Sequence, residues 1–147
     1  MKRLLMLIMT SLALHVAVAQ LGKIPAEVTA GFAAKYPGVT DVQWKNNLSD
    51  YTAKFTSKHS TKCEASFNGK GEWQSTEEEI DSTHLPHAVK DGLAKSKYAD
   101  RELKEVMKIE KKKSEVVYRL LMKKNDVEKK YVTFNKEGKL VKESMTL

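Results

Sequence analysis

The sequence has one cysteine, three prolines and seven glycines in 147 residues, and it has few of the patterns that signal chemistry. A single cysteine, Cys63, excludes any disulfide within the chain. HExxH metal elements, nucleophile elbows and glycine-rich phosphate loops are all absent from the sequence. We therefore expect neither an enzyme nor a bound cofactor. We interpret Cys63 as a small buried residue on a strand, with a free thiol or a link between two chains as alternatives.

The sequence also lacks an apolar run long enough to span a bilayer, which requires about 20 residues. Its apolar stretch at residues 4–17 follows Lys2 and Arg3 and ends in small residues at positions 17 and 19. This three-part layout is typical of a secretory signal peptide that is cleaved before Gln20. We predict that residues 1–19 are removed and that residues 20–147 are periplasmic or secreted, without stable insertion into a membrane.

Positive charge is only mildly in excess. Loss of Lys2 and Arg3 with the signal peptide lowers the formal net charge from +7 to +5. Acidic residues lie between the lysines along the chain, a mixture that usually belongs to a solvated surface. Export and the lack of an exposed aromatic stacking platform argue against a nucleic-acid partner. Attraction to an acidic partner or an anionic envelope surface is consistent with this charge.

A five-residue pattern occurs twice and organises the mature chain. Residues 67–71 read FNGKG and residues 134–138 read FNKEG, and both lie between runs of apolar and aromatic residues. Asparagine favours the start of a tight turn, and Gly71 and Gly138 can adopt the left-handed conformation that closes such a loop with a bulge. The pattern predicts two β-hairpin tips and an internal duplication.

A helix is predicted before each hairpin. Residues 24–36 carry apolar side chains four positions apart, begin with an Ile-Pro pair suited to a first helical turn, and stop at Pro37-Gly38. The second helix begins at Leu85-Pro86 in the matching position. Gly31 and Gly92 fall beside the apolar stripes, and glycine costs about 1 kcal/mol relative to alanine in a helix. Their presence suggests that each helix packs closely on a sheet.

After each helix, apolar residues alternate with polar ones as they do in strands. The alternating sets are Val42 and Trp44; Tyr51, Ala53 and Phe55; Cys63, Ala65 and Phe67; Val116, Tyr118, Leu120 and Met122; and Val132 and Phe134, with Trp73 and Leu140 following the hairpin tips. The segment 100–115 is ambiguous, because its composition favours a helix whereas the repeat favours a strand. We follow the repeat, since Leu103, Met107 and Ile109 share the parity of a strand, and we expect residues 111–114 to form a solvated hairpin turn. The two halves then differ by a six-residue insertion between the second helix and its second strand.

The sequence therefore predicts an α+β fold of two tandem α-β-β-β-β repeats, residues 24–80 and 85–147. A polar, acidic linker at residues 76–84 joins them. A unit of about 60 residues would be marginal alone. We therefore expect one domain, residues 20–147, in which both repeats share one antiparallel sheet with both helices packed on one face.

The sheet face opposite the helices is the candidate binding surface. If the apolar sets face the helices, the intervening side chains face outward. These are Thr52, Lys54, Thr56, Lys58, Glu64, Ser66, Val117, Arg119, Leu121, Tyr131 and Thr133. Most of them suit water, but Val117, Arg119, Leu121 and Tyr131 resemble the aliphatic, guanidinium and aromatic anchors of protein interfaces. We predict that these four residues, with Lys54 and Thr56, bind a protein partner; a homodimer contact would explain the patch equally well.

Two other functions remain open from the sequence. A binder of a small ligand or an anionic envelope polymer would need a concave pocket with converging polar groups. A metal-binding protein could use His84 and His87, which are three positions apart with Glu79 and Asp81 nearby. Pro86 suggests, however, that the helix begins only between these two histidines.

The repeated helix starts and hairpins resemble a family of exported bacterial proteins described as beta-lactamase-inhibitor-like, PepSY-like. The matching marks are Ile24-Pro25 with Tyr36-Pro37-Gly38, Leu85-Pro86 with Tyr98, and the two hairpin segments at residues 67–71 and 134–138. The resemblance covers essentially the whole mature chain. It implies two copies of a helix with a four-stranded meander, and a periplasmic or secreted binding protein that can be inhibitory toward an enzyme.

The chain departs from this family in two places. Ala99-Asp100 follows Tyr98 where the family has Pro-Gly, and Asn68 and Asn135 stand where relatives are usually acidic. All the matching motifs are turns and caps, so they imply the fold and no inhibitory residue carries over from them.

Overall fold

The computed structural model describes residues 23–146, so the predicted signal peptide lies outside the described residues. The first half contains α1 (Ala26–Lys35), β1 (Gln43–Asn46), β2 (Asp50–Thr56), β3 (Lys62–Asn68) and β4 (Trp73–Glu79). The second half contains η1 (Ser82–His84), α2 (His87–Ala94), β5 (Glu102–Lys111), η2 (Lys112–Ser114), β6 (Glu115–Lys123), β7 (Lys129–Asn135) and β8 (Leu140–Met145). The predicted α+β class is confirmed, and a helix followed by four strands occurs twice. Descent of the two halves from a duplication stays a prediction.

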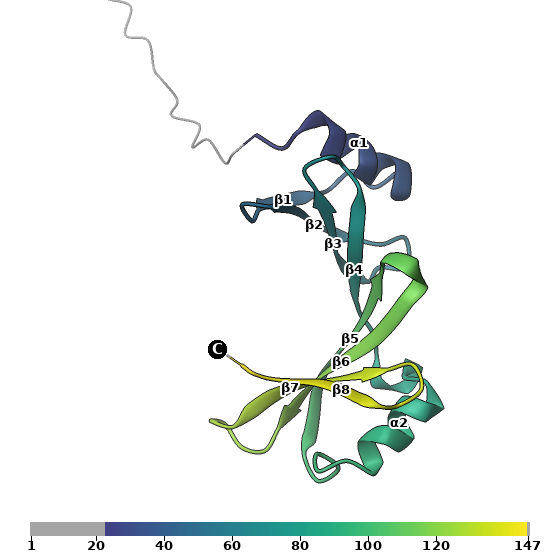
Figure 1. The fold of residues 1–147 in the computed structure, drawn as a ribbon, viewed down its shortest axis with the longest axis vertical. Helices are drawn as coiled ribbons and strands as arrows, with labels where there is room; N and C mark the ends of the chain where they lie inside the picture. Colours follow the sequence, from purple (N-terminus) through teal and green to yellow (C-terminus); the bar gives the residue numbers. More distant parts are fainter. Residues whose placement is uncertain (1–22, 147) are drawn as a thin grey trace, which may run out of the picture.

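All eight strands form one antiparallel sheet in the order β1 to β8, so each strand pairs with its neighbour in sequence. Residues directly opposite each other on paired strands share a face. One row of such partners crosses the sheet from β2 to β8: Phe55, Cys63, Glu78, Lys108, Tyr118, Phe134 and Leu140. Its two ends belong to the cores under α1 and α2, so both helices lie on one face, as predicted. Figure 1 shows the sheet bending into a C with both helices on the outer side.

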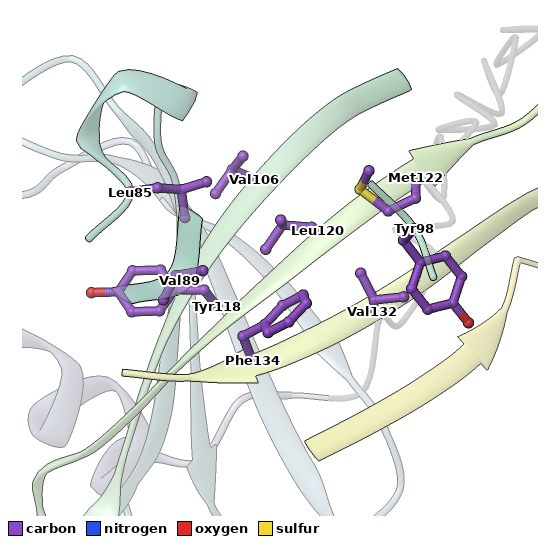
Figure 2. Packing of buried hydrophobic residues seen from close by; sticks show 9 residues of the cluster. All are labelled: Leu85, Val89, Tyr98, Val106, Tyr118, Leu120, Met122, Val132 and Phe134. Carbon is purple, nitrogen blue, oxygen red and sulfur yellow. The ribbon is translucent and has the colours of Figure 1, made fainter. Parts of the chain in front are cut away.

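Two separate hydrophobic cores hold the helices to the sheet. The α1 core contains Val28 and Phe32 over the buried residues of β2 and β3. The α2 core contains Val89 over β5, β6 and β7, and nine of its side chains are drawn in Figure 2. The two cores have no residue in common. Between them, the helix-side positions of β4 and β5 are polar: Thr76, Glu78, Lys108 and Glu110. We call this row of four residues the seam.

The repeated hairpin tips touch the helices through glycine. Gly71 and Gly138 have φ of 76° and 80°, the left-handed conformation expected for them. A Cβ placed on Gly31 would lie 2.1 Å from the carbonyl oxygen of Gly71, and one on Gly92 would lie 1.9 Å from that of Gly138. The predicted close packing of both helices is therefore confirmed, and each contact is made with a hairpin tip.

The helix starts differ slightly from the prediction. Pro25 and Pro86 have extended backbones, with ψ of 146° and 145°, so they precede the first turn and do not form part of it. Their carbonyl oxygens accept the first helical hydrogen bonds, from the amide N–H groups of Val28 at 3.1 Å and Val89 at 3.0 Å. A proline suits this place because a helix start has no use for its missing N–H group.

The predicted linker at residues 76–84 is wrong in its first half, because β4 continues to Glu79. Thr76 pairs with Glu110 and Glu79 with Met107, which joins the two halves into one sheet. The acidic residues 77–79 were taken for a linker because a strand without a buried apolar face is uncommon. Here one side of β4 faces the polar seam and the other faces the open side of the sheet, so both sides tolerate charge.

The ambiguous segment is a strand, as the repeat predicted. β5 has ten residues where β1 has four, so the insertion lengthens the central strand. The turn after it is exposed, with Lys113 and Ser114 at φ of 62° and 59°. The predicted shared parity is wrong, because the register shifts between Leu103 and Glu105. Leu103 consequently faces α2, whereas Ile109 faces the open side.

Candidate functional site

The open face of the sheet carries a hollow of about 640 Å³ that extends over β4 to β8. Figure 1 shows this side as the inside of the C. We call it the concave hollow. Its lining alternates along each strand, as it must when one face of a sheet forms a surface.

Two apolar side chains form the floor of the concave hollow. Ile109 and Val117 are direct cross-strand partners and are only 8% and 5% exposed. Neither helix within residues 23–146 covers this face, so the surrounding open-face side chains account for the burial of Ile109 and Val117. The floor therefore closes the bottom of the concave hollow, and a partner would bury mainly the side chains around it, such as Tyr131.

An ion pair lies across this floor. Arg119 on β6 reaches over β5 to Glu77 on β4, with Nη2–Oε2 at 2.5 Å and Nη1–Oε1 at 3.3 Å. The guanidinium carbon also lies 5.4 Å from the ring centroid of Tyr131, which is within the range of a cation–π contact. The two-point fork fixes the guanidinium plane. The Nε atom of Arg119 is buried and has no hydrogen-bond partner among the described residues.

The structure brings together half of the predicted partner-binding residues. Val117, Arg119 and Tyr131 line the concave hollow. Leu121 lies just beside it, because it is the cross-strand partner of Tyr131. The prediction that Val117 is an exposed anchor is wrong, since it forms part of the buried floor.

Lys54 and Thr56 lie on the predicted face but away from the concave hollow. Both are exposed on β2, and Lys54 forms an ion pair with Glu64 on the neighbouring strand, with Nζ–Oε1 at 2.7 Å. Parity predicts which face a side chain takes, but it does not predict which strands the curvature brings together. A role of Lys54 and Thr56 in partner binding therefore stays a prediction.

Sequence reasoning assigned four of the eleven lining residues to the open face and missed the other seven, of which three matter most here. Glu77 had been assigned to the linker, Ile109 was hidden by the bulge in β5, and Lys142 lies on β8 beyond the second hairpin. For β4, the alternation of Ser75 and Glu77 with helix-side residues could have indicated a strand with these two side chains on the open face. No comparable signal was present for the bulge.

The β1–β2 and β6–β7 hairpin tips lie at the open side of the C (Figure 1). Each of them carries a fully exposed apolar side chain. Leu48, between β1 and β2, is 102% exposed, and Val127, between β6 and β7, is 95% exposed. Leu48 has φ of 68°, and the Ser49 amide donates to the Asn47 carbonyl oxygen at 2.8 Å. This is a γ-turn with a left-handed centre, which is rare and strained for leucine.

His84 and His87, the candidate metal ligands, do not form a metal site with the acidic residues near them. His84 ends η1, and His87 starts α2 with its Nδ1 3.1 Å from Oδ2 of Asp91 in the same helix. Within residues 23–146, no group of three or more His, Cys, Asp and Glu side chains is placed to hold a metal ion. Neither helix in this part of the chain is long and apolar enough to cross a bilayer.

Comparison with known proteins supports the fold. A family model described as putative beta-lactamase-inhibitor-like, PepSY-like matches residues 49–142. The chain is similar to a crystal structure of a DUF2874 family protein from Bacteroides ovatus, with a TM-score of 0.77 and 22% identity over 84% of this chain and 88% of that one. It is also similar to a BLIP-like protein from Bacteroides fragilis, with a TM-score of 0.73 and 22% identity over 84% and 89%.

A structure of putative periplasmic proteins from Bacteroides eggerthii gives a TM-score of 0.77 at 18% identity, covering 84% of this chain and 90% of that one. No curated protein matches the chain. At these identities, the likeness to solved structures shows the fold alone.

Proposed function

The chain belongs to the putative beta-lactamase-inhibitor-like, PepSY-like family, and from this premise we propose that it is an exported, non-enzymatic protein that binds another protein through the concave hollow. The observation that carries the proposal is the hollow itself, with an apolar floor and an arginine and a tyrosine at its centre. Buried aromatic and guanidinium groups supply much of the binding energy at protein interfaces. Two of the similar structures, one described as BLIP-like and one as putative periplasmic proteins, agree with an exported binding protein.

The charge of the concave hollow favours an acidic segment of the partner. Lys111, Arg119 and Lys142 line it with one lining acid, Glu77. Arg119 is paired with Glu77, and Lys111 is paired with Glu115 outside the lining, with Nζ–Oε1 at 2.9 Å, so Lys142 is the lining cation with no ion pair among the described residues. Arg119 is already oriented by Glu77 and Tyr131, so a partner carboxylate would meet a fixed guanidinium and lose less freedom on binding. A rival occupant is a second copy of this chain.

A photo-crosslinking experiment tests this proposal. The mature chain carries benzoylphenylalanine in place of Tyr131 or, as a control, in place of Ala34, which is exposed on α1 on the other face. After irradiation in an envelope extract from the source organism, we expect one discrete adduct from position 131 and none from position 34. Mass spectrometry identifies the adduct; a mass of two copies would indicate a homodimer. Identical products from both positions, or none from either, would rule out the concave hollow as the binding surface.

The double variant Leu121→Asp/Tyr131→Ala then measures the contribution of the surface. We expect the affinity for the identified partner to fall by at least about 30-fold, since central interface residues contribute about 2 kcal/mol or more. Calorimetry gives the affinity and circular dichroism gives the folding control. Unchanged affinity in a folded double variant would contradict the proposal. Because the family is described as beta-lactamase-inhibitor-like, a panel of β-lactamases is the first set of purified partners to assay.

Leu48→Asn separates stability from binding at one hairpin tip. Asparagine tolerates the left-handed conformation better than leucine, so we expect the free energy of unfolding to stay level or rise by up to about 1 kcal/mol. The same change removes a fully exposed apolar side chain at the mouth, so the crosslink yield from position 131 should fall. Urea denaturation and adduct quantification measure the two effects. Loss of stability with full crosslinking would show that Leu48 serves the fold and not the partner.

A further inference from the structure

A second hollow, of about 380 Å³, lies on the helix side of the sheet at the seam between the two cores. The end of α1 and the turn after it form one wall, and β2 to β5 form the rest. The α1 core ends at Phe55 and Cys63. The seam residues next to them are polar and belong to neither core, so the space above the seam is left unfilled. We call it the seam cleft. It is on the opposite face from the concave hollow.

The wall formed by α1 and β2 is apolar and rigid. The ring centroids of Tyr36 and Phe55 lie 4.7 Å apart, and Phe32 packs on both rings at 5.1 Å. Val39, in the turn after α1, packs against the same core and lines the cleft. A volume of this size, with an apolar wall and a few polar groups, is typical of small-molecule sites.

The back of the seam cleft is a row of polar groups already fixed by hydrogen bonds. The Tyr36 hydroxyl is hydrogen-bonded to Oγ1 of Thr76, which also accepts from Nε1 of Trp73 at 2.8 Å. Lys108 forms an ion pair with Glu110, with Nζ–Oε1 at 2.7 Å, and lies opposite Glu78 on the neighbouring strand. A ligand therefore meets a preorganised surface here and does not have to order it.

The mouth of the seam cleft is cationic. Lys35, Lys58 and His59 line it from α1 and the β2–β3 loop. In the described part of the chain, neither Lys35 nor Lys58 has a carboxylate within 4.0 Å, in contrast to Lys108 at the back. The Nζ atom of Lys35 lies 3.9 Å from the ring centroid of Trp73, so it is held near the protein surface. An anionic group at the mouth would gain attraction without breaking an existing ion pair.

We propose that the seam cleft binds a small organic anion with a ring-containing apolar body. The apolar body lies against Tyr36, Val39 and Phe55, and the anionic group lies at the mouth near Lys35 and Lys58. This activity is independent of the concave hollow, because the two sites lie on opposite faces of the sheet.

Cys63 supplies a reporter for this site. Its thiol lines the seam cleft at 6% exposure, and it is the only cysteine in the sequence, so one mass shift reports its modification. Burial, and to a lesser degree the carboxylate of Glu78, raises the pKa of the Cys63 thiol. Since the thiolate is the reactive form, alkylation should be slow in the free protein and slower when a ligand covers the thiol.

The test uses 8-anilinonaphthalene-1-sulfonate as the probe and the mature chain as the protein. We expect saturable binding of one equivalent by fluorescence titration. The uncharged analogue N-phenyl-1-naphthylamine should bind at least about fivefold more weakly, since it lacks the anionic group. Val39→Trp fills the cleft and should weaken probe binding at least about tenfold, and Lys58→Glu should weaken it about three- to tenfold.

Matched controls make the same Val→Trp and Lys→Glu substitutions outside the seam cleft. Val127→Trp and Lys136→Glu lie on exposed hairpin tips outside the seam cleft and should leave probe binding unchanged. Saturating probe should slow iodoacetamide alkylation of Cys63 at least about fivefold, as followed by intact mass at a fixed alkaline pH. If Val39→Trp fails to fold, Lys58→Glu and the alkylation rate still decide the question.

Any of the following results would overturn the proposal: no saturable binding, equal binding by the cleft variants and their controls, or an alkylation rate that the probe leaves unchanged. Loss of probe binding in Leu121→Asp/Tyr131→Ala alone would place the anion in the concave hollow and also overturn it. None of these results depends on a protein partner, so they leave the proposed function to its own experiment.

Discussion

Replacement of Gly71 by alanine is expected to lower the free energy of unfolding by about 3–5 kcal/mol, combining left-handed backbone strain with an overpacked contact. The φ of Gly71 is 76°, and a Cβ there would lie 2.0 Å from the carbonyl oxygen of Glu27 on α1. Neither side of this contact can yield by rotating a side chain, because both atoms belong to backbone. The hairpin tip would have to move away from the helix and would loosen the α1 core.

Two other glycines separate the causes of this loss. Gly38 has φ of 83° with nothing within 4 Å of a built Cβ, so Gly38→Ala should cost only the conformational strain of about 1–2 kcal/mol. Gly69 has neither feature, and Gly69→Ala should stay within about 0.5 kcal/mol of the wild type. Urea denaturation followed by circular dichroism measures the series. Equal losses of unfolding free energy for Gly71→Ala and Gly38→Ala would show that the clash of the added Cβ with α1 contributes nothing.

Phe32→Ala is expected to lower the free energy of unfolding by about 3–5 kcal/mol, the usual cost of truncating a fully buried phenylalanine. Phe32 is 4% exposed and its ring packs on Tyr36, Trp44, Phe55 and Phe67 with centroids 5.1–6.0 Å apart. The cavity would open at the centre of an aromatic cluster, where stiff rings collapse poorly into empty space.

Leu93→Ala is the matched control for Phe32→Ala. Leu93 occupies the corresponding place on α2, but it is only half-buried at the edge of its core. We expect a loss of about 1–2 kcal/mol there, because solvent already reaches part of the side chain. Thermal and urea unfolding compare the two variants. A loss for Phe32→Ala no larger than that for Leu93→Ala would mean that the aromatic cluster closes around the missing ring.

Much of this fold can be predicted from the sequence, because its strands alternate and its turns use residues with strong preferences. The two Phe-Asn-x-x-Gly tips predict both hairpins, and the alternation around Leu120 and Val132 predicts the face that lies under α2. The failures have particular physical causes. The acidic end of β4 is polar on both faces, and the bulge in β5 switches faces without a local sequence signal.

The candidate sites were harder to predict than the fold. Parity assigns Arg119 and Tyr131 to the open face, and these residues do meet at the concave hollow. Parity also assigns Lys54 there, although it lies outside that hollow. The seam cleft was not foreseen, because it depends on where the α1 core ends and that requires the three-dimensional packing of helix and sheet.

The separation of the two cores also has a mechanical consequence. Since no buried residue belongs to both, flexing the molecule at β4 and β5 unpacks neither of them. The ladder between Ser75–Glu79 and the facing residues of β5 joins the two halves of the C. The span between the Leu48 and Val127 tips is therefore set by the twist and bend of β4 and β5, at the place where the helix side of the sheet has a polar row and no core.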